Sequence, residues 1–285
     1  MQLKNHPSVG LGAMELAFQE KRPSIDEAHK MIDSLIAEHG LTYIDTADAY
    51  ALGEEDFGYG ERIMARYMKR DDVLVASKIG FTRQGTTWKA CGTPEYLRKA
   101  CDLSLKNLGV DSIPLCQFHT PDPNVPIVDS IGELSRLQSE GKIQSIGVCN
   151  FMSDEALSEA MSVAKIVSLQ NPLSVLFYEQ EPHDEMLQFC ETNDITFVAF
   201  APLGGHRNPT ALETVPPLIE LAAAEGITVR QLALLFLKSL SPNLISIPGS
   251  IVKEHIIENL AVNQMTLRKE VKAQILEFMT EAEEE

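Results

Sequence analysis

Short apolar runs alternate with stretches of amphipathic helical spacing along almost the whole chain of 285 residues. Several runs are nearly continuous in apolar residues and are bounded by Gly, Pro or Asp, which is typical of parallel strands covered on both faces. This alternation predicts an α/β protein built on a parallel sheet. The apolar runs are 8–14, 42–47, 73–79, 113–119, 143–150, 166–172, 196–202 and 244–248.

Helix signals lie between these runs. Ser24 and Glu27 have the spacing of a capping box that opens a helix over 25–38. No linker rich in Pro, Gly or Ser divides the chain, so the eight strands and their helices favour one (β/α)8 TIM barrel over residues 1–285 rather than two doubly wound halves. Further helices are predicted over 95–107, 126–140, 215–225, 228–239 and 267–285.

Composition limits the partners of the chain. The 24 basic and 41 acidic residues give a formal charge of −17, which argues against nucleic acid as a partner because phosphate backbones are bound mainly by clustered Lys and Arg. Five cysteines form no CxxC pair, and the histidines show no metal-ligand spacing, so we expect reduced thiols and no metal site. The longest tight apolar run, 232–237, is too short to cross a membrane, so we expect a soluble, cytoplasmic protein.

Polar residues follow successive predicted strands, where a barrel places its chemistry. Asp45 and Tyr50 follow the second strand, Lys78 ends the third and His119 ends the fourth. A tyrosine with an ordinary pKa of about 10 is a weak proton donor, and a neighbouring lysine lowers that pKa. Such a tyrosine could protonate a carbonyl oxygen while a nicotinamide delivers hydride to the carbon.

Each of these residues also has a simpler interpretation. Lys78 by itself would be a solvated lysine, His119 a structural histidine and Asp45 the cap of a turn. Their joint occurrence at the ends of consecutive strands favours a single acid–base site.

Eight stretches of the sequence match, in order, those of one known family: VGLGAM, DTADAY, VLVASKIG, SLKNLGVDSIPLCQFHTPD, GKIQSIGVCNF, SLQNPLSVL, FVAFAPLGG and IPGS with ENL. On these stretches the chain resembles an aldo-keto reductase over nearly its whole length. The family implies a (β/α)8 barrel that binds a nicotinamide cofactor without a Rossmann domain and reduces an aldehyde or ketone to an alcohol. The last two matching stretches resemble the branch that includes pyridoxal reductases.

Carried over by motif position, the resemblance implies that Tyr50 is the proton donor, that Lys78 and Asp45 tune it, and that His119 orients the substrate carbonyl. The same resemblance implies contacts along the cofactor, from its carboxamide through its nicotinamide ring and pyrophosphate to its adenosine end. The carboxamide would contact Cys149, Asn150 and Gln170, the nicotinamide ring Phe200, and the pyrophosphate Leu203. The adenosine end would contact Ser250, Lys253, His255, Glu258 and Asn259.

The chain departs from the family pattern at the adenosine end. NADP-preferring members usually carry Lys or Arg where this chain has Gly249 or Ile251, and often Arg where it has His255. We still expect NADP(H) as the cofactor, bound by a site with less fixed positive charge. Glu258, expected near the adenine ribose, leaves NAD(H) as an alternative cofactor. Cys149 stands where Ser is usual, and nucleophilic catalysis by its thiol is not expected.

Two aromatic residues and two other functions remain open at this point. Tyr59 competes formally with Tyr50, but the spacing from Asp45 favours Tyr50, and Trp88 fits either a substrate contact or surface packing. A cofactor-binding regulatory or sensor subunit with slow turnover is the main alternative to an enzyme, and a cofactor-free lyase or isomerase is a weaker one. The sequence sets neither the substrate, the physiological direction nor the oligomeric state.

Overall fold

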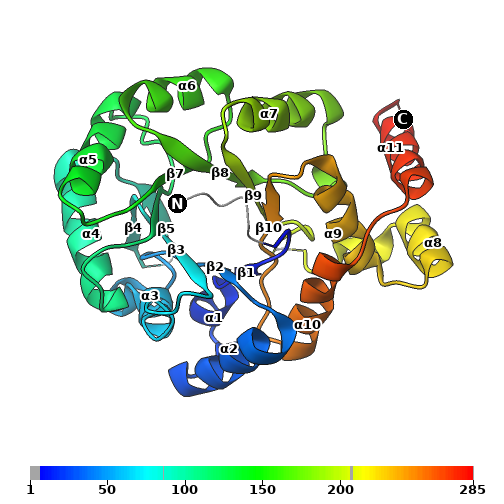
Figure 1. Ribbon diagram of the computed structural model, residues 1–285, viewed down its shortest axis with the longest axis horizontal. Coiled ribbons are helices and arrows are strands. Elements are labelled where there is room, and N and C mark those ends of the chain that lie inside the picture. The colour runs from blue at the N-terminus through cyan, green and yellow to red at the C-terminus, as the bar shows by residue number, and fades with distance from the viewer. Residues whose placement is uncertain (1–6, 86, 206–207, 285) are drawn as a thin grey trace.

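Eight parallel strands form one curled sheet at the centre of the molecule (Figure 1). The structure, a computed structural model, describes residues 7–85, 87–205 and 208–284. The strand order is β1-β2-β3-β6-β7-β8-β9-β10, so each strand of the sheet pairs with the next one in sequence. The strands are β1 (Leu11–Gly12), β2 (Tyr43–Asp45), β3 (Leu74–Ile79), β6 (Leu115–Phe118), β7 (Ile146–Cys149), β8 (Ile166–Pro172), β9 (Thr196–Phe200) and β10 (Leu244–Ser246).

The two ends of this sheet join and close the barrel. Val9 pairs with Ser246 in a parallel bridge, and the N–H of Gly10 donates to the Ser246 carbonyl at 2.9 Å. The N–H of Ser246 in turn donates to the carbonyl of Ser8 at 2.7 Å. The predicted (β/α)8 barrel and its eight strands are therefore confirmed, with several strands shorter than the apolar runs that predicted them.

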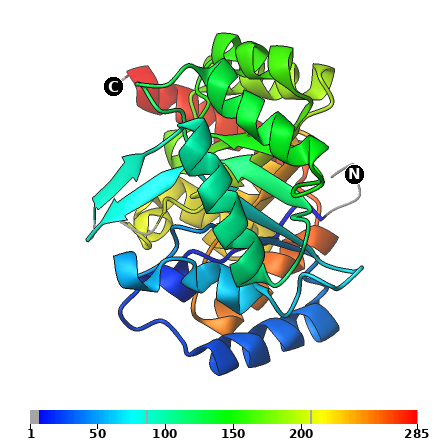
Figure 2. The ribbon, with the colours of Figure 1, turned by 90° about the vertical axis from the view of Figure 1, so that its left-hand side faces the viewer.

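Helices form a ring around the barrel (Figures 1 and 2). The predicted capping box opens the first long helix, where the Ser24 N–H donates to the Glu27 carboxylate at 2.9 Å and the Glu27 N–H to Ser24 Oγ at 3.3 Å. The α-helices are α1 (Glu15–Phe18), α2 (Ile25–His39), α3 (Tyr59–Met64), α4 (Pro94–Leu108), α5 (Ile127–Ser139), α6 (Asp154–Val163), α7 (Gln180–Thr192), α8 (Pro216–Glu225), α9 (Val229–Leu240), α10 (Lys253–Ala261) and α11 (Lys269–Glu284). Short 3-10 turns are η2 (Glu54–Asp56), η3 (Val175–Phe177), η4 (Ala211–Thr214) and η5 (Val262–Gln264).

Alternate strand residues pack into two separate apolar layers. Ile44 and Val75 belong to the large layer that the strands share with the surrounding helices. Their chain neighbours Tyr43 and Leu74 belong to a smaller cluster with residues of other strands, such as Val198. This is the two-residue alternation of a strand, and it explains why the runs are apolar throughout: both faces are buried.

A β-hairpin lies between the apolar run 73–79 and the helix predicted over 95–107, where the sequence predicted neither strand nor helix. Its strands are β4 (Phe81–Gln84) and β5 (Thr87–Ala90), which pair antiparallel directly after β3. Figure 2 shows the hairpin projecting from one side of the barrel. The chain returns from it to the barrel through the Cys91 N–H, which donates to the Gly80 carbonyl at 2.9 Å.

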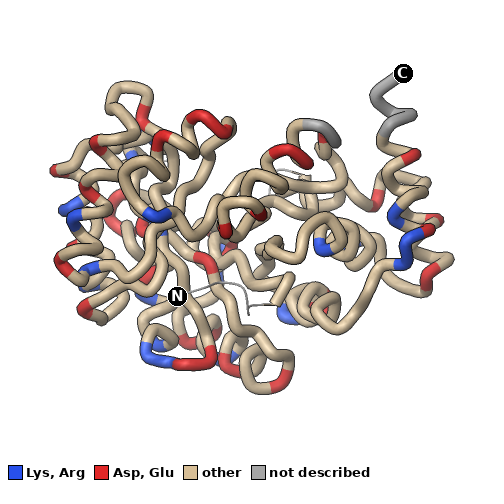
Figure 3. The backbone as a smooth tube through the Cα atoms, turned by 45° about the horizontal axis from the view of Figure 1, so that its top comes forward, with Lys and Arg blue, Asp and Glu red and all other residues tan. Residues whose placement is uncertain are grey.

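Acidic residues are spread over much of the chain, as Figure 3 shows for its surface helices and loops. The −17 charge is therefore not confined to the Glu-rich C-terminal end. The part of the chain that the structure describes contains no helix long and apolar enough to span a membrane.

Candidate active site

The predicted acid–base residues come together at neighbouring strand ends. Lys78 Nζ on β3 lies 2.5 Å from Asp45 Oδ1 at the end of β2 and 2.9 Å from the Tyr50 hydroxyl. It also donates to the Thr46 carbonyl at 2.9 Å. Because β2 and β3 are paired in register, Lys78 reaches the segment that follows Asp45 without leaving the barrel interior. One fully buried ammonium group thus joins the carboxylate to the phenol.

Two amide side chains hold the other oxygen of Asp45. Gln117 Nε2 donates to Asp45 Oδ2 at 3.0 Å, and Gln170 Nε2 donates to the same atom at 2.8 Å. Both glutamines are buried and come from β6 and β8, the two strands on either side of β7. The sequence analysis missed Gln117, although a polar residue inside the otherwise apolar run of β6 was a signal for it.

Burial and charge set the protonation states of the pair. Burial lowers the pKa of Lys78, but the adjacent Asp45 carboxylate and Tyr50 hydroxyl outweigh this and hold the pKa above its usual value. Burial raises the pKa of Tyr50 to about 12, although Lys78 acts to lower it. Lys78 thus acts in the direction predicted from the sequence, but burial has the larger effect. At neutral pH the phenol therefore carries its proton.

His119 packs against the Tyr50 ring and is neutral. The two rings meet edge to face with their centroids 5.9 Å apart. Burial, and then the positive charge of Lys78, lowers the pKa of His119 well below its usual value. Its Nδ1 is buried and has no hydrogen-bond partner among the residues that the structure describes. A neutral imidazole with a free polar atom can accept or donate a hydrogen bond to a bound substrate.

A cavity of about 930 Å³ opens beside these residues. Tyr50, Asp45 and His119 line it, while Lys78 lies behind them. Most of the residues that the resemblance assigned to the cofactor line the same cavity: Cys149, Asn150, Gln170, Phe200, Leu203, Ser250, His255 and Asn259. Lys253 and Glu258 are not among the lining residues. Lys253 is the first residue of α10, and the Glu258 carboxylate accepts a hydrogen bond from the Thr228 hydroxyl.

Asn150 has a left-handed backbone conformation, with φ of 62°, that asparagine tolerates better than most residues. Its side-chain nitrogen donates to the His119 carbonyl at 2.9 Å and lies 3.3 Å from Cys149 Sγ. These contacts tie the end of β7 to the end of β6. Burial raises the pKa of Cys149 to about 12, so its sulfur is a neutral thiol and not the thiolate that a nucleophile requires.

The β4–β5 hairpin supplies one wall of the cavity. Trp88 on β5 lines the cavity, with its ring centroid 6.2 Å from that of Tyr50 and 6.1 Å from that of His119. Phe81 on β4 packs against both Trp88 and His119, at 5.4 and 4.6 Å between centroids. Of the two interpretations left open for Trp88, the structure supports a place in the pocket wall.

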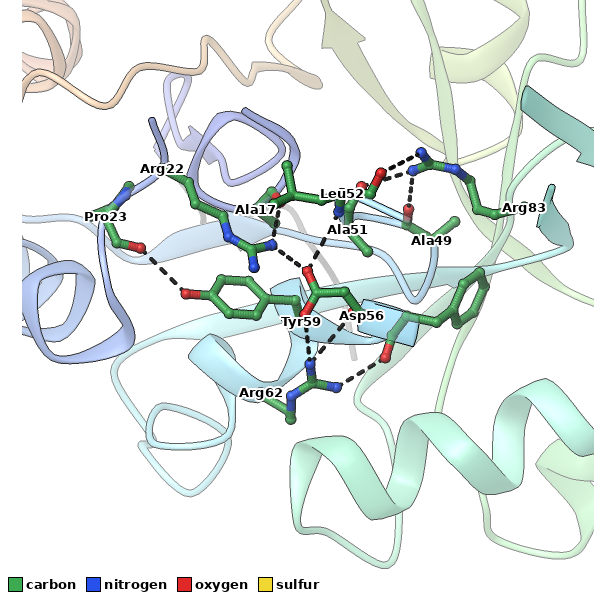
Figure 4. Close-up of polar contacts among 11 residues, drawn as sticks. Ala17, Arg22, Pro23, Ala49, Ala51, Leu52, Asp56, Tyr59, Arg62 and Arg83 are labelled. Atoms are coloured by element: carbon green, nitrogen blue, oxygen red, sulfur yellow. Dashed lines mark hydrogen bonds and ion pairs between the residues drawn. The ribbon is translucent and has the colours of Figure 1, made fainter. Parts of the chain in front are cut away.

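Arg83 connects this hairpin to the segment around Tyr50 (Figure 4). Its guanidinium donates to the carbonyls of Ala49, Ala51 and Leu52, at 3.3, 2.8 and 3.2 Å. The side chain is almost completely buried, burial lowers its pKa, and it lies 4.7 Å from the centroid of the Trp88 ring. Arg83 thus holds the segment that carries Tyr50 in place against the Trp88 wall of the cavity.

Tyr59, the other tyrosine after β2, makes its hydrogen bond outside the group of Tyr50, Lys78 and His119. Its hydroxyl donates to the Pro23 carbonyl at 3.3 Å, and the Arg22 guanidinium covers its ring at 3.5 Å (Figure 4). The ring does pack near Tyr50 through the apolar cluster that both share. Its contacts favour a structural role for Tyr59, whereas the Tyr50 hydroxyl, which the spacing from Asp45 favoured, contacts Lys78.

Known proteins resemble the chain over nearly its full length. The profile of the Aldo/keto reductase family matches residues 8–279. Pyridoxine 4-dehydrogenase from Escherichia coli is 31% identical over 92% of this chain and 91% of its own. Aldo-keto reductase yakc [NADP(+)] from Schizosaccharomyces pombe is 28% identical over 97% and 89%. The solved structure of the glycerol dehydrogenase AKR11B4 from Gluconobacter oxydans matches with a TM-score of 0.81 at 23% identity, over 96% of this chain and 91% of that one.

Fold and family together define an oxidoreductase that interconverts carbonyl compounds and alcohols with a nicotinamide cofactor. The chain belongs to the aldo/keto reductase family. Among the described residues, no group of three or more His, Cys, Asp or Glu side chains is arranged to hold a metal ion.

Proposed function

We propose that the chain reduces a small aldehyde or ketone with NADPH in the cavity beside Tyr50, and that Tyr50 is the proton donor. The observation that carries this proposal is the Tyr50 hydroxyl 2.9 Å from the buried Lys78 ammonium, with the His119 ring packed edge to face against the Tyr50 ring. A cavity large enough for both a cofactor and a small substrate opens at this point.

The chemistry of the residues follows from their arrangement. The Tyr50 hydroxyl gives its proton to the carbonyl oxygen, and the ammonium of Lys78 at 2.9 Å stabilises the phenolate that remains. Asp45 holds Lys78 charged and in place. The free imidazole nitrogen of His119 is available to orient the carbonyl oxygen. The nicotinamide, when bound, supplies the hydride.

The residues of the cavity fit a nicotinamide dinucleotide. At one end, Asn150 and Gln170 offer amide groups beside Phe200, whose ring face suits a flat aromatic ligand. At the other end Asn259 is buried, and its side-chain oxygen has no hydrogen-bond partner within the described chain. Such an acceptor suits an amino group like that of adenine. The name of the yeast relative supports NADP as the cofactor of this chain.

The similarity to pyridoxine 4-dehydrogenase supports pyridoxal as the first substrate to test. The aromatic wall of Phe81 and Trp88 suits a flat, ring-shaped aldehyde of that kind. We further propose that the chain acts as one domain in the cytoplasm on small carbonyl compounds. The five cysteines support such a reducing compartment, because all of them are free thiols.

Oxidation of NADPH in the presence of pyridoxal and a panel of other aldehydes tests the proposal. Loss of a positioned proton donor costs about 10²- to 10⁴-fold in rate, so we expect Tyr50→Phe to lose activity by that factor while it still binds NADPH. Tyr59→Phe is the matched control, and it should keep the wild-type rate because its hydroxyl is bonded to Pro23. Wild-type protein that binds NADPH tightly but reduces nothing would instead support a regulatory subunit, and full activity of Tyr50→Phe would exclude Tyr50 as the donor.

A further inference from the structure

A phosphate-bearing cofactor needs positive charge in the cavity, and the family resemblance implied Lys253 as a contact at the adenosine end. The structure gives another source. Among the described residues that line the cavity, Arg230 is the one lysine or arginine. It lines the same cavity as Ser250 and His255, which the family resemblance assigned to the adenosine end of the cofactor.

Arg230 is the second residue of α9 and is held by one carboxylate atom. Its Nε lies 2.9 Å and its Nη2 2.8 Å from Oε1 of Glu213 in η4. The Nη1 group takes part in neither of these contacts. The arginine side chain is 23% exposed and that of Glu213 is 38% exposed, so water reaches both partners and their ion pair is weak.

The first turn of α9 packs beside α10, the helix that follows Ser250. Gln231 Nε2 donates to the Glu258 carbonyl at 3.2 Å, and the Thr228 hydroxyl donates to the Glu258 carboxylate. Arg230 thus contacts Glu213, which follows the cavity-lining residues Pro209 and Thr210, while its neighbours in the same turn contact α10. No acidic residue lies in the first turn of α9, where the helix dipole favours an anion.

We propose that Arg230 binds a phosphate group of the dinucleotide and exchanges Glu213 for it, an inference that rests on the function proposed above. A phosphate carries more charge than a carboxylate and accepts two parallel hydrogen bonds from a guanidinium, so it competes well with the single Glu213 oxygen. Two phosphates of the cofactor have this chemistry, the pyrophosphate and the 2′-phosphate of NADP. Arg230 would thereby supply the fixed positive charge that Gly249, Ile251 and His255 do not.

Calorimetric titration of the purified protein with NADPH, NADH and 2′,5′-ADP tests this assignment without any turnover. We expect Arg230→Gln to weaken NADPH binding by at least about tenfold, the usual loss for a charge-assisted hydrogen bond to phosphate. Equal weakening of NADH identifies the pyrophosphate, whereas weakening confined to NADPH and 2′,5′-ADP identifies the 2′-phosphate. Arg66→Gln is the matched control, because Arg66 is an exposed arginine that pairs with the Asp33 carboxylate and does not line the cavity. It should bind all three ligands like the wild type.

Glu213→Gln provides a second test that does not remove the arginine. It frees Arg230 from its carboxylate, so we expect NADPH to bind as tightly as to the wild type or more tightly. Dissociation constants of Arg230→Gln within twofold of the wild type for every ligand would overturn the inference, as would clear weakening by Glu213→Gln. A wild-type protein that binds neither dinucleotide would contradict the proposed function itself, a result distinct from a loss specific to Arg230.

Discussion

Tyr50 illustrates how environment changes the chemistry of a single residue. In water its hydroxyl has an ordinary pKa of about 10, and a neighbouring ammonium would lower that value. Here burial has the larger effect and raises the pKa of Tyr50 to about 12, with Lys78 still 2.9 Å away. The lysine therefore matters most after proton transfer, when it faces a phenolate.

The lowered pKa of His119 has a consequence for stability. The folded protein binds a proton at His119 less readily than the unfolded chain does. The stability that neutral His119 contributes is therefore present above about pH 6.5 and is lost as the pH falls below that value. Between pH 7.5 and 5.5 we expect wild type to lose about 1 kcal/mol more free energy of unfolding than His119→Gln. Urea unfolding at both pH values measures this difference, and identical losses in the two proteins would refute the assigned direction.

Sequence reasoning found the residues whose positions follow from strand ends. Asp45, Tyr50, Lys78 and His119 were predicted because a barrel brings the ends of successive strands to one rim. Arg230 was missed because it lies in the first turn of a helix, where an arginine usually meets solvent. Its contribution to the cavity depends on how α9 packs beside η4 and α10, which no local pattern records.

At the scale of elements, the long helices and buried strands could be predicted, while the β4–β5 hairpin could not. Each of its strands has four residues, and their burial pattern is mixed, so neither shows a buried strand's apolar run. Gly85, with φ of 57°, was the one local turn signal. An isolated hairpin is marginal in water, and this one depends on tertiary contacts of Trp88 and Arg83 that link distant segments.

The hairpin's attachment through Arg83 can be tested directly. Arg83→Met leaves the carbonyls of Ala49, Ala51 and Leu52 without this donor, so we expect a loss of about 1–3 kcal/mol in the free energy of unfolding. The emission of Trp88, the single tryptophan, should shift to the red as the wall loosens. Lys89→Met, which changes an exposed residue of the same hairpin, is the control. Unchanged emission and stability in Arg83→Met would show that the hairpin is held by other contacts.

At the scale of the whole molecule, closure of the barrel explains how an acidic protein can hold an anionic cofactor. Strand ends and helix starts from distant parts of the chain converge on one cavity, so a few local groups can favour phosphate despite a net charge of −17. Val9 and Asn263, 254 positions apart, pair through two hydrogen bonds beside the Val9–Ser246 bridge that closes the barrel. The cavity is thus a product of the complete fold.

Transfer of deuterium from NADPH to product tests the central claim most directly. The protein is incubated with pyridoxal, or with the best aldehyde of the panel, and NADPH labelled with deuterium at both hydrogens of nicotinamide C4, and the alcohol is analysed by mass spectrometry. The account predicts one deuterium on the former carbonyl carbon with wild type and Tyr59→Phe, and an at least about hundredfold slower appearance of that product with Tyr50→Phe. An unlabelled alcohol, or labelled alcohol formed equally fast by Tyr50→Phe, would contradict it.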